Sequence, residues 1–174
     1  MAQRDARNRL QPALLDRLID DSRADRAEAD DRRVMSKTQL RQAVLRDLSA
    51  LFNAVQPLAA AEQVHPMLAA SVLNYGLPPL SGQLASKLDV SVLERVIREA
   101  IVRFEPRILA ETLSVRALDA GSVLDTHNVI EFEIRGHLWS QPVPLEILLR
   151  TQVDLEAGQV EVRDVASGAL STQR

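Results

Sequence analysis

The chain contains no cysteine, which excludes disulfide bonds and cysteine nucleophiles and fits a reducing compartment. Aromatic residues make up only 3% of its 174 residues, so a core must be built from the Leu, Val, Ile and Ala of a chain that is 46% apolar. The net charge of −3 provides no basic surface for nucleic acid. His65, His127 and His137 lack the spacing of metal ligands. We therefore expect no metal, no cofactor and no nucleic-acid partner.

Long apolar runs are also missing. No stretch approaches the 18 residues that would cross a membrane, and the first ten residues lack the apolar segment of a signal peptide. We therefore expect a cytoplasmic protein without membrane insertion. For a chain of this length, one domain with tails is the expected organisation.

Residues 1–35 form a charged arm in which arginines and acidic residues occur in equal numbers. Residues 22–33 contain almost no large apolar side chain, which predicts a mobile linker. A short apolar face precedes this linker and consists of Leu14, Leu15, Leu18 and Ile19. The face could dock on its own domain or lie in the groove of a partner, and the charged linker favours the partner. We predict that deleting residues 1–22 leaves the domain folded but weakens partner binding.

Residues 36–53 have the spacing of an amphipathic helix. Ser36 and Gln39 fit a capping box at its start. The predicted buried stripe is Leu40, Val44, Leu48, Leu51 and Phe52. We assign this helix to the core, without chemistry of its own.

A second amphipathic helix is predicted to begin at Ser91, with Glu94 completing a capping box. Because Pro106 disfavours helical geometry at Glu105, this helix should end near Phe104. Its predicted apolar stripe is Val92, Val96, Ile97, Ala100, Ile101 and Phe104.

After Arg107 the apolar period changes from that of a helix to that of a strand. Alternation predicts an antiparallel sheet, with a bulge at Gly136. The predicted strands are residues 110–118, 129–138, 146–155 and 159–163. The expected fold is α+β, with two to three helices packed on one antiparallel sheet of three to four strands, over residues 36–165. Residues 166–174 should form a disordered tail.

The last two strands end the chain, so at least one is expected at an edge of the sheet. An edge strand can pair with a strand of another protein. Arg150, Gln152 and Asp154 lie on the polar face of the strand at 146–155 without interrupting its backbone. We predict that this strand binds a partner by β-augmentation.

Four segments in order resemble motifs of one family: PALLDRL (12–18), SVLNYGLPPLSG (71–82), FEPRI (104–108) and the C-terminal hairpin (132–160). The chain resembles the TssE family of type VI secretion baseplate subunits, related to the small "lysozyme-like" baseplate wedge protein of contractile phage tails. Pro79 departs from the motif, where an acidic residue is common.

This resemblance implies a structural protein that lies in a baseplate wedge beside the TssF and TssG subunits, near the first ring of sheath subunits. It also implies that the sheet resembles the part of a sheath subunit that exchanges strands. The Glu-Pro-Arg signature of the family matches Glu105, Pro106 and Arg107, and the resemblance implies that these residues act in assembly.

The alternative from another class is a lysozyme-like glycoside hydrolase acting on peptidoglycan. Glu131 and Glu133 lie roughly 6–7 Å apart along one strand face, but that face is predicted to be solvated, where no carboxyl pKa would be raised. Glu105 and Glu111 lack an aromatic platform for sugar. We therefore expect no enzymatic activity. A third alternative is a soluble adaptor unrelated to secretion.

Glu105 and Arg107 have two interpretations. An exposed ion pair within the chain would close the helix end and contribute about 0–1 kcal/mol. Alternatively, the charges reach a neighbouring subunit, which the family resemblance favours. On the second interpretation, Arg107→Ala should leave the fold nearly as stable and weaken sheath assembly.

Overall fold

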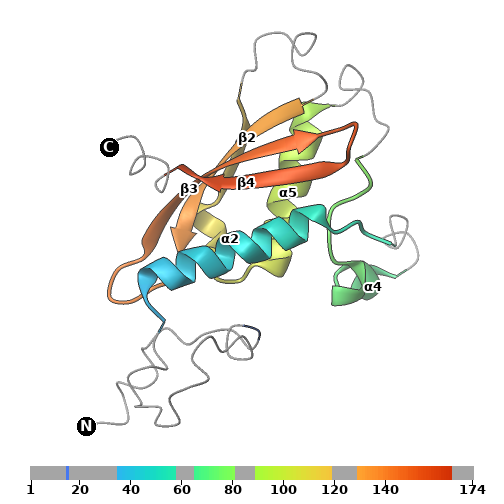
Figure 1. Ribbon diagram of the computed structural model, residues 1–174. Coiled ribbons are helices and arrows are strands. Elements are labelled where there is room, and N and C mark those ends of the chain that lie inside the picture. Colours follow the sequence, from blue (N-terminus) through green and yellow to red (C-terminus); the bar gives the residue numbers. More distant parts are fainter. Residues whose placement is uncertain (1–14, 16–34, 58–64, 81–88, 119–128, 166–174) are drawn as a thin grey trace, which may run out of the picture.

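The computed structural model describes Leu15 and residues 35–57, 65–80, 89–118 and 129–165. Within these ranges, helices pack on a four-stranded antiparallel sheet, which confirms the predicted α+β fold (Figure 1). The helices described are α2, α4 and α5, with one short 3-10 turn between α4 and α5 and another between α5 and the first strand.

Helix α2 spans Lys37–Asn53, and the capping box at its start is confirmed. The Ser36 hydroxyl oxygen accepts from the Gln39 backbone N–H, and the Gln39 side chain accepts from the Ser36 N–H. The predicted stripe is buried and gains Ala43. Its side chains form one wall of the core.

Helix α5 spans Val90–Phe104 and ends where Pro106 predicts. The capping box predicted at Ser91 is wrong, because Asp89 is the N-cap and accepts from the Ser91 backbone N–H. Glu94 instead accepts from Ala117 N–H on the first strand. The apolar stripe is also rotated from the prediction, since Leu93 is buried and Val92 is exposed.

Helix α4 (Pro66–Ala69) and the 3-10 turn η3 (Val72–Asn74) lie between these two helices in the chain. Asn74 holds this turn locally, because its buried side-chain amide donates to the Ala69 carbonyl. Gly76 has a φ of 122°, and a Cβ there would lie 2.3 Å from the carbonyl oxygen of Ala54. Only glycine fits that backbone at this close approach.

The four strands follow one another in space as they do in the chain, in the order β1-β2-β3-β4. Their bounds are Ser114–Ala117 (β1), Val129–Leu138 (β2), Leu145–Asp154 (β3) and Gln159–Asp164 (β4). The bulge predicted at Gly136 is wrong, because Gly136 pairs with Ile147 in a continuous register. A Cβ at Gly136 would lie 3.4 Å from the Ile108 side chain, at the limit of ordinary van der Waals contact.

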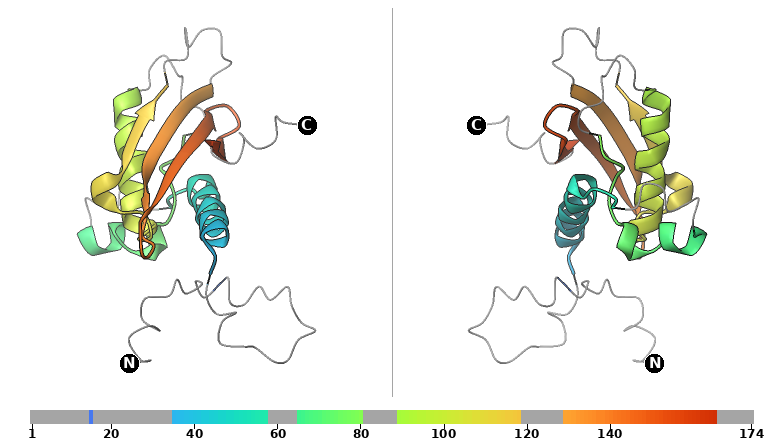
Figure 2. Two further views of the ribbon diagram at one scale, coloured as in Figure 1. Left: turned by 90° about the vertical axis from the view of Figure 1, so that its left-hand side faces the viewer. Right: turned by 90° about the vertical axis from the view of Figure 1, so that its right-hand side faces the viewer.

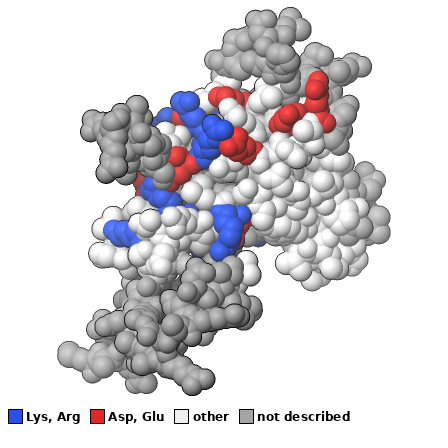
Figure 3. Space-filling view, in the orientation of Figure 1, with Lys and Arg blue, Asp and Glu red and all other residues white. Residues whose placement is uncertain are grey.

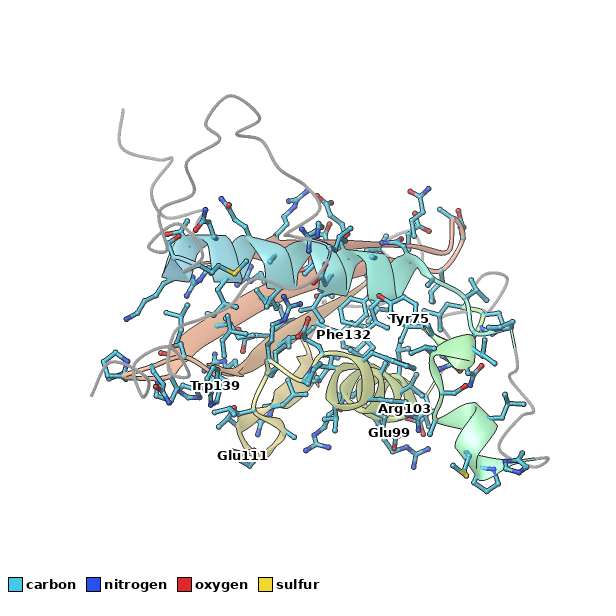
Figure 4. All side chains as sticks on the ribbon, turned by 90° about the horizontal axis from the view of Figure 1, so that it is seen from below. Tyr75, Glu99, Arg103, Glu111, Phe132 and Trp139 are labelled. Atoms are coloured by element: carbon cyan, nitrogen blue, oxygen red, sulfur yellow. The ribbon has the colours of Figure 1, made fainter. Side chains whose placement is uncertain are left out.

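One face of the sheet carries the core. Ile130 pairs with Val153 and Val153 with Val160, so apolar side chains from three strands lie in one row. Helix α5 packs along the β1 side of this face and α2 along the β4 side (Figure 2). Phe132 lies between the two helices and is fully buried, which contributes about 2–3 kcal/mol through the hydrophobic effect (Figure 4).

One of the last two strands lies at an edge of the sheet, as expected, but it is β4; the strand predicted at 146–155, which was expected to pair with a partner, is central. Strand β3 pairs with β2 on one side and β4 on the other, so its backbone is used within the sheet. The edge strands are β1 and β4. Arg150, Gln152 and Asp154 therefore lie on a central strand and cannot template a partner strand there.

Several predictions fall on residues outside the described ranges. These are the linker at 22–33, the tail at 166–174, and Leu14, Leu18 and Ile19 of the apolar face. Leu15 is described and is 51% exposed. In the part of the chain that the structure describes, no helix is long and apolar enough to cross a membrane.

Candidate functional site

The candidate site is a corner formed by Glu105, Pro106 and Arg107, which we call the Glu-Pro-Arg corner. It begins where α5 ends, and the Glu105 N–H still donates to the Ile101 carbonyl. The chain after the corner is tied to the end of β2, because Trp139 N–H donates to the Arg107 carbonyl at 2.7 Å. Helix and sheet together thus fix the backbone on both sides of Pro106.

The side chains of the corner form a forked ion pair. Arg107 Nε donates to Glu105 Oε1 at 2.7 Å, and Nη2 donates to the second carboxylate oxygen. The Arg107 Nη2 also donates to Oδ2 of Asp47 on α2, and Arg46 pairs with the other oxygen of Asp47. Charge therefore alternates along a chain of four side chains that joins α2 to the end of α5.

The expectation that this ion pair is exposed is wrong. Glu105 is only 3% exposed, and the Arg107 side chain is 25% exposed. Burial opposes the charge on Arg107, but the hydrogen bonds and attraction of Glu105, followed by those of Asp47, outweigh it and raise the pKa of the guanidinium. Because a buried carboxylate without a partner is costly, the pair is part of the fold.

A pocket of about 330 Å³ lies beside the corner. Its apolar wall includes Tyr75 and Phe104, whose rings meet edge to face with centroids 5.2 Å apart. Figure 4 shows Tyr75 between α2 and α5, where its hydroxyl lies 3.4 Å from the Asp47 carbonyl oxygen. Burial, followed by the negative charges of Asp47 and Glu105, raises the pKa of Tyr75. The full lining is Asp47, Leu48, Leu51, Tyr75, Phe104, Glu105, Pro106 and Arg107.

Asp47 was not predicted as a site residue, since the helix at 36–53 was assigned to the core without chemistry of its own. Its partner Arg107 is 60 residues further along the chain, so no local pattern connects them. The segment that supplies Tyr75 was recognised as a motif, but not as a wall of the same pocket.

The three residues predicted on β3 do not lie at the corner. Gln152 donates to Glu131 Oε1 at 2.6 Å across the β2–β3 ladder. Asp154 accepts from two backbone N–H groups of the turn before β4. Arg150 is exposed and contributes to the positive field at Glu133. A partner role for these side chains stays a prediction, now on a sheet face and not at an edge.

Glu131 and Glu133, the carboxylates considered for a glycoside hydrolase, are both held by hydrogen bonds. Arg135 Nε donates to Glu133 at 2.6 Å and is the main cause of a lowered Glu133 pKa. Glu131 is held by Gln152, as described above. A glycosidase acid needs a raised pKa, so the environment of Glu133 gives this alternative no support.

Each edge of the sheet is capped at one point by a helix side chain. The Asn53 side chain of α2 accepts from Val160 N–H and donates to the Val160 carbonyl, as a neighbouring strand would. At the other edge, Glu94 of α5 accepts from Ala117 N–H at 2.6 Å. In an antiparallel ladder, outward-facing residues alternate, so Val162 on β4 also presents its N–H and carbonyl outward.

These features define a small α+β domain whose two helices and sheet meet at a charged corner. In the described ranges no group of three or more His, Cys, Asp or Glu could hold a metal ion. Comparison with protein families matches residues 38–143 to the baseplate wedge protein gp25 family, and the chain belongs to this family. Comparison with curated proteins and with solved structures found no match. The matched residues include the Glu-Pro-Arg corner and Tyr75. As a member of this family, the chain is a structural baseplate wedge component.

Proposed function

We propose that this chain is the wedge subunit of a type VI secretion baseplate that binds TssF and TssG and helps initiate sheath polymerisation. Family membership supports a wedge role. The resemblance of residues 12–18, 71–82, 104–108 and 132–160 to type VI secretion sequences supports the narrower assignment and a cytoplasmic location.

The observation that carries this proposal is the pocket beside the Glu-Pro-Arg corner. The ion pair fixes the pocket wall, while Pro106 and part of the Arg107 guanidinium stay accessible to solvent. A rigid pocket of this kind suits a protein anchor, because a partner loses little entropy in ordering it. The corner thus has both of the roles considered for it: an ion pair within the fold and a wall for a partner.

Asp47→Asn separates these two roles, because it keeps the Glu105–Arg107 pair and removes one charge from the pocket. The Asp47 side chain is 29% exposed, so we expect a loss of less than about 1 kcal/mol in stability. Affinity for a purified TssF–TssG complex should fall at least tenfold. Glu99→Gln, at an exposed ion pair on α5, is the matched control. Unchanged affinity of the Asp47→Asn variant would contradict the pocket's role.

For sheath initiation, we propose that a strand of the first sheath ring pairs with the β4 edge at Val162. This replaces the pairing on β3, which the sheet topology excludes. Asn53 covers the edge at Val160, so Val162 is the next residue of β4 whose backbone groups face outward. Outward-facing backbone groups of an edge strand can template another strand.

Val162→Pro tests the edge, since proline is tolerated where the N–H of an edge strand faces outward. The variant should stay folded, as measured by thermal unfolding, but should not support sheath assembly. Val162→Ala removes the same side-chain packing and retains the N–H, so it should assemble sheaths. Normal sheath assembly by a folded Val162→Pro variant would refute pairing at this edge.

A further inference from the structure

The segment around α4 and η3 carries no charged side chain. From Val64 to Ser86 the chain has no Asp, Glu, Lys or Arg, although such residues make up 26% of the whole. On the side of the molecule seen in Figure 3, charged atoms gather over the strands and over the start of α2, whereas the region where α4 lies is uncharged. Exposed apolar side chains in an uncharged stretch of a charged domain indicate contact with an apolar partner.

The apolar side chains of this segment point to solvent. Met67, Val72 and Leu73 are 78%, 79% and 66% exposed, and Pro66 is also exposed. We call these four residues the α4–η3 surface. Large side chains this exposed contribute little to the core, so burial within the chain does not account for them.

Side-chain hydrogen bonds hold the backbone of the α4–η3 surface in place. Arg103 of α5 donates to the Ala69 carbonyl at 3.1 Å, and the buried Asn74 amide donates to the same carbonyl. The Ser71 hydroxyl donates to the Leu68 carbonyl and accepts from Leu73 N–H. In Figure 4, Arg103 lies on the side of α5 that faces α4. Apolar side chains on a preorganised backbone bind with a small loss of conformational entropy.

This surface is continuous with the pocket of the Glu-Pro-Arg corner. Tyr75 follows η3 directly and lines the pocket against Phe104. Arg103, which holds the Ala69 carbonyl, is adjacent in sequence to Phe104. One partner segment could therefore extend from the pocket past Tyr75 onto Leu73 and Val72, with the exposed Arg103 as a charged neighbour at the junction.

We infer that the α4–η3 surface binds an apolar, uncharged segment of the same wedge partner whose anchor occupies the corner pocket. The inference rests on the proposed function and adds the chemistry of the partner: Leu, Ile, Met or Phe side chains without an ionised group at the centre of the contact. Because Val64–Ser86 contains no charged residue, this surface complements an apolar partner. Tyr75, which follows η3 and lines the pocket, connects the surface to the corner.

The test uses the full chain with Val72→Glu and Leu73→Glu together. Both side chains are exposed, so the double variant should unfold at the wild-type temperature within a few degrees. Its affinity for the purified TssF–TssG complex should fall at least tenfold. Val92→Glu makes the same chemical change at an exposed valine near the start of α5, 11 residues before Arg103, and should bind as wild type does.

Further measurements distinguish the proposed partner from a second copy of the chain and from the chain's own arm as the occupant of the α4–η3 surface. If the isolated wild-type chain is a dimer in light scattering and the double variant is a monomer, a second copy occupies the surface and the inference is wrong. If deleting residues 1–34 changes the Met67 methyl resonance of the isolated chain, its own arm occupies it, which also refutes the inference. If Asp47→Asn weakens binding and the double variant does not, the proposed function stands and this inference fails.

Discussion

Glu105 places a carboxylate in the interior, and Arg107 is the cation that the structure pairs with it. Removing the guanidinium should leave a buried charge without its forked partner. We therefore expect Arg107→Ala to lose about 2 kcal/mol of unfolding free energy, less than for a fully buried pair because Arg107 is partly exposed. This corrects the prediction, made from sequence, that the fold would be nearly unaffected. The measurement is denaturant unfolding.

A double variant shows whether the buried charge is the cause. Combining Glu105→Gln with Arg107→Ala removes the buried charge and leaves the same gap as Arg107→Ala, so the double variant should be more stable than Arg107→Ala alone. Equal stability of the two variants would mean that lost packing, and not the unpaired carboxylate, dominates.

Thr151 illustrates a polar group that the fold leaves unsatisfied. Its side chain is fully buried on the core face of β3, and its hydroxyl has no hydrogen-bond partner among the described residues. Thr151→Val keeps the shape and removes that hydroxyl, so it should raise the unfolding free energy by about 1 kcal/mol. Thr112→Val is the control: the Thr112 hydroxyl accepts from His137 N–H and donates to Leu109, so this change should destabilise. Chemical unfolding of both variants checks the opposite signs.

At the scale of elements, the sequence correctly predicted the features that depend on neighbouring residues alone, such as where a helix begins and ends. Ser36 and Pro106 marked a helix start and a helix end because caps and proline act on their own backbone. Val92 and Leu93 are both apolar and about 100° apart on the helix, so only packing against the sheet decides which is buried. Gly136 was predicted as a bulge because a glycine within a strand often marks one, whereas its pairing with Ile147 keeps the register continuous.

The start of α5 should depend on pH through its N-cap. The Ser91 hydroxyl and backbone N–H both donate to Asp89, and the side-chain bond is the larger cause of its lowered pKa. A lowered folded-state pKa means that the cap stabilises above the usual carboxyl pKa and is lost as pH falls through the folded value. Asp89→Ala should therefore unfold at a lower temperature than wild type at pH 7, and the difference should shrink below about pH 4.

Asp89→Asn is the control for this titration. Asparagine is an equally good N-cap and carries no proton in this range. The gap between the Asn and Ala variants should therefore stay nearly constant with pH in thermal unfolding. A pH-independent gap between wild type and Asp89→Ala would show that the carboxylate does not cap the helix.

At the scale of the whole molecule, the sequence predicted four strands and two main helices but not their neighbours. A central strand and an edge strand show the same apolar alternation when each has one buried face. No local sequence pattern therefore marked β3 as a central strand. The corner was recognised by its motif, whereas its partner Asp47 comes from a helix that meets α5 only in the folded domain. Both misses are contacts between segments far apart in sequence.

The N-terminal arm predicted from the sequence gives the last prediction. The buried core residues that the structure describes run from Leu40 to Val160, and the partly buried Met35, which the deletion keeps, packs against them ahead of α2. Deleting residues 1–34 should therefore change the unfolding free energy by less than about 0.5 kcal/mol, within the range of surface changes. Affinity for the TssF–TssG complex should fall, because the deletion removes Leu14, Leu15 and Leu18, and Leu15 is exposed and free to bind.

A point variant keeps the arm and tests its apolar face alone. Leu14→Asp with Leu18→Asp retains the length of the chain and the linker, so it should reduce affinity as much as the deletion does. Calorimetry and denaturant unfolding on the same preparations separate binding from folding. A deletion that unfolds the domain would place the arm in the core, and a deletion that binds with unchanged affinity would remove Leu14, Leu15 and Leu18 from the interface.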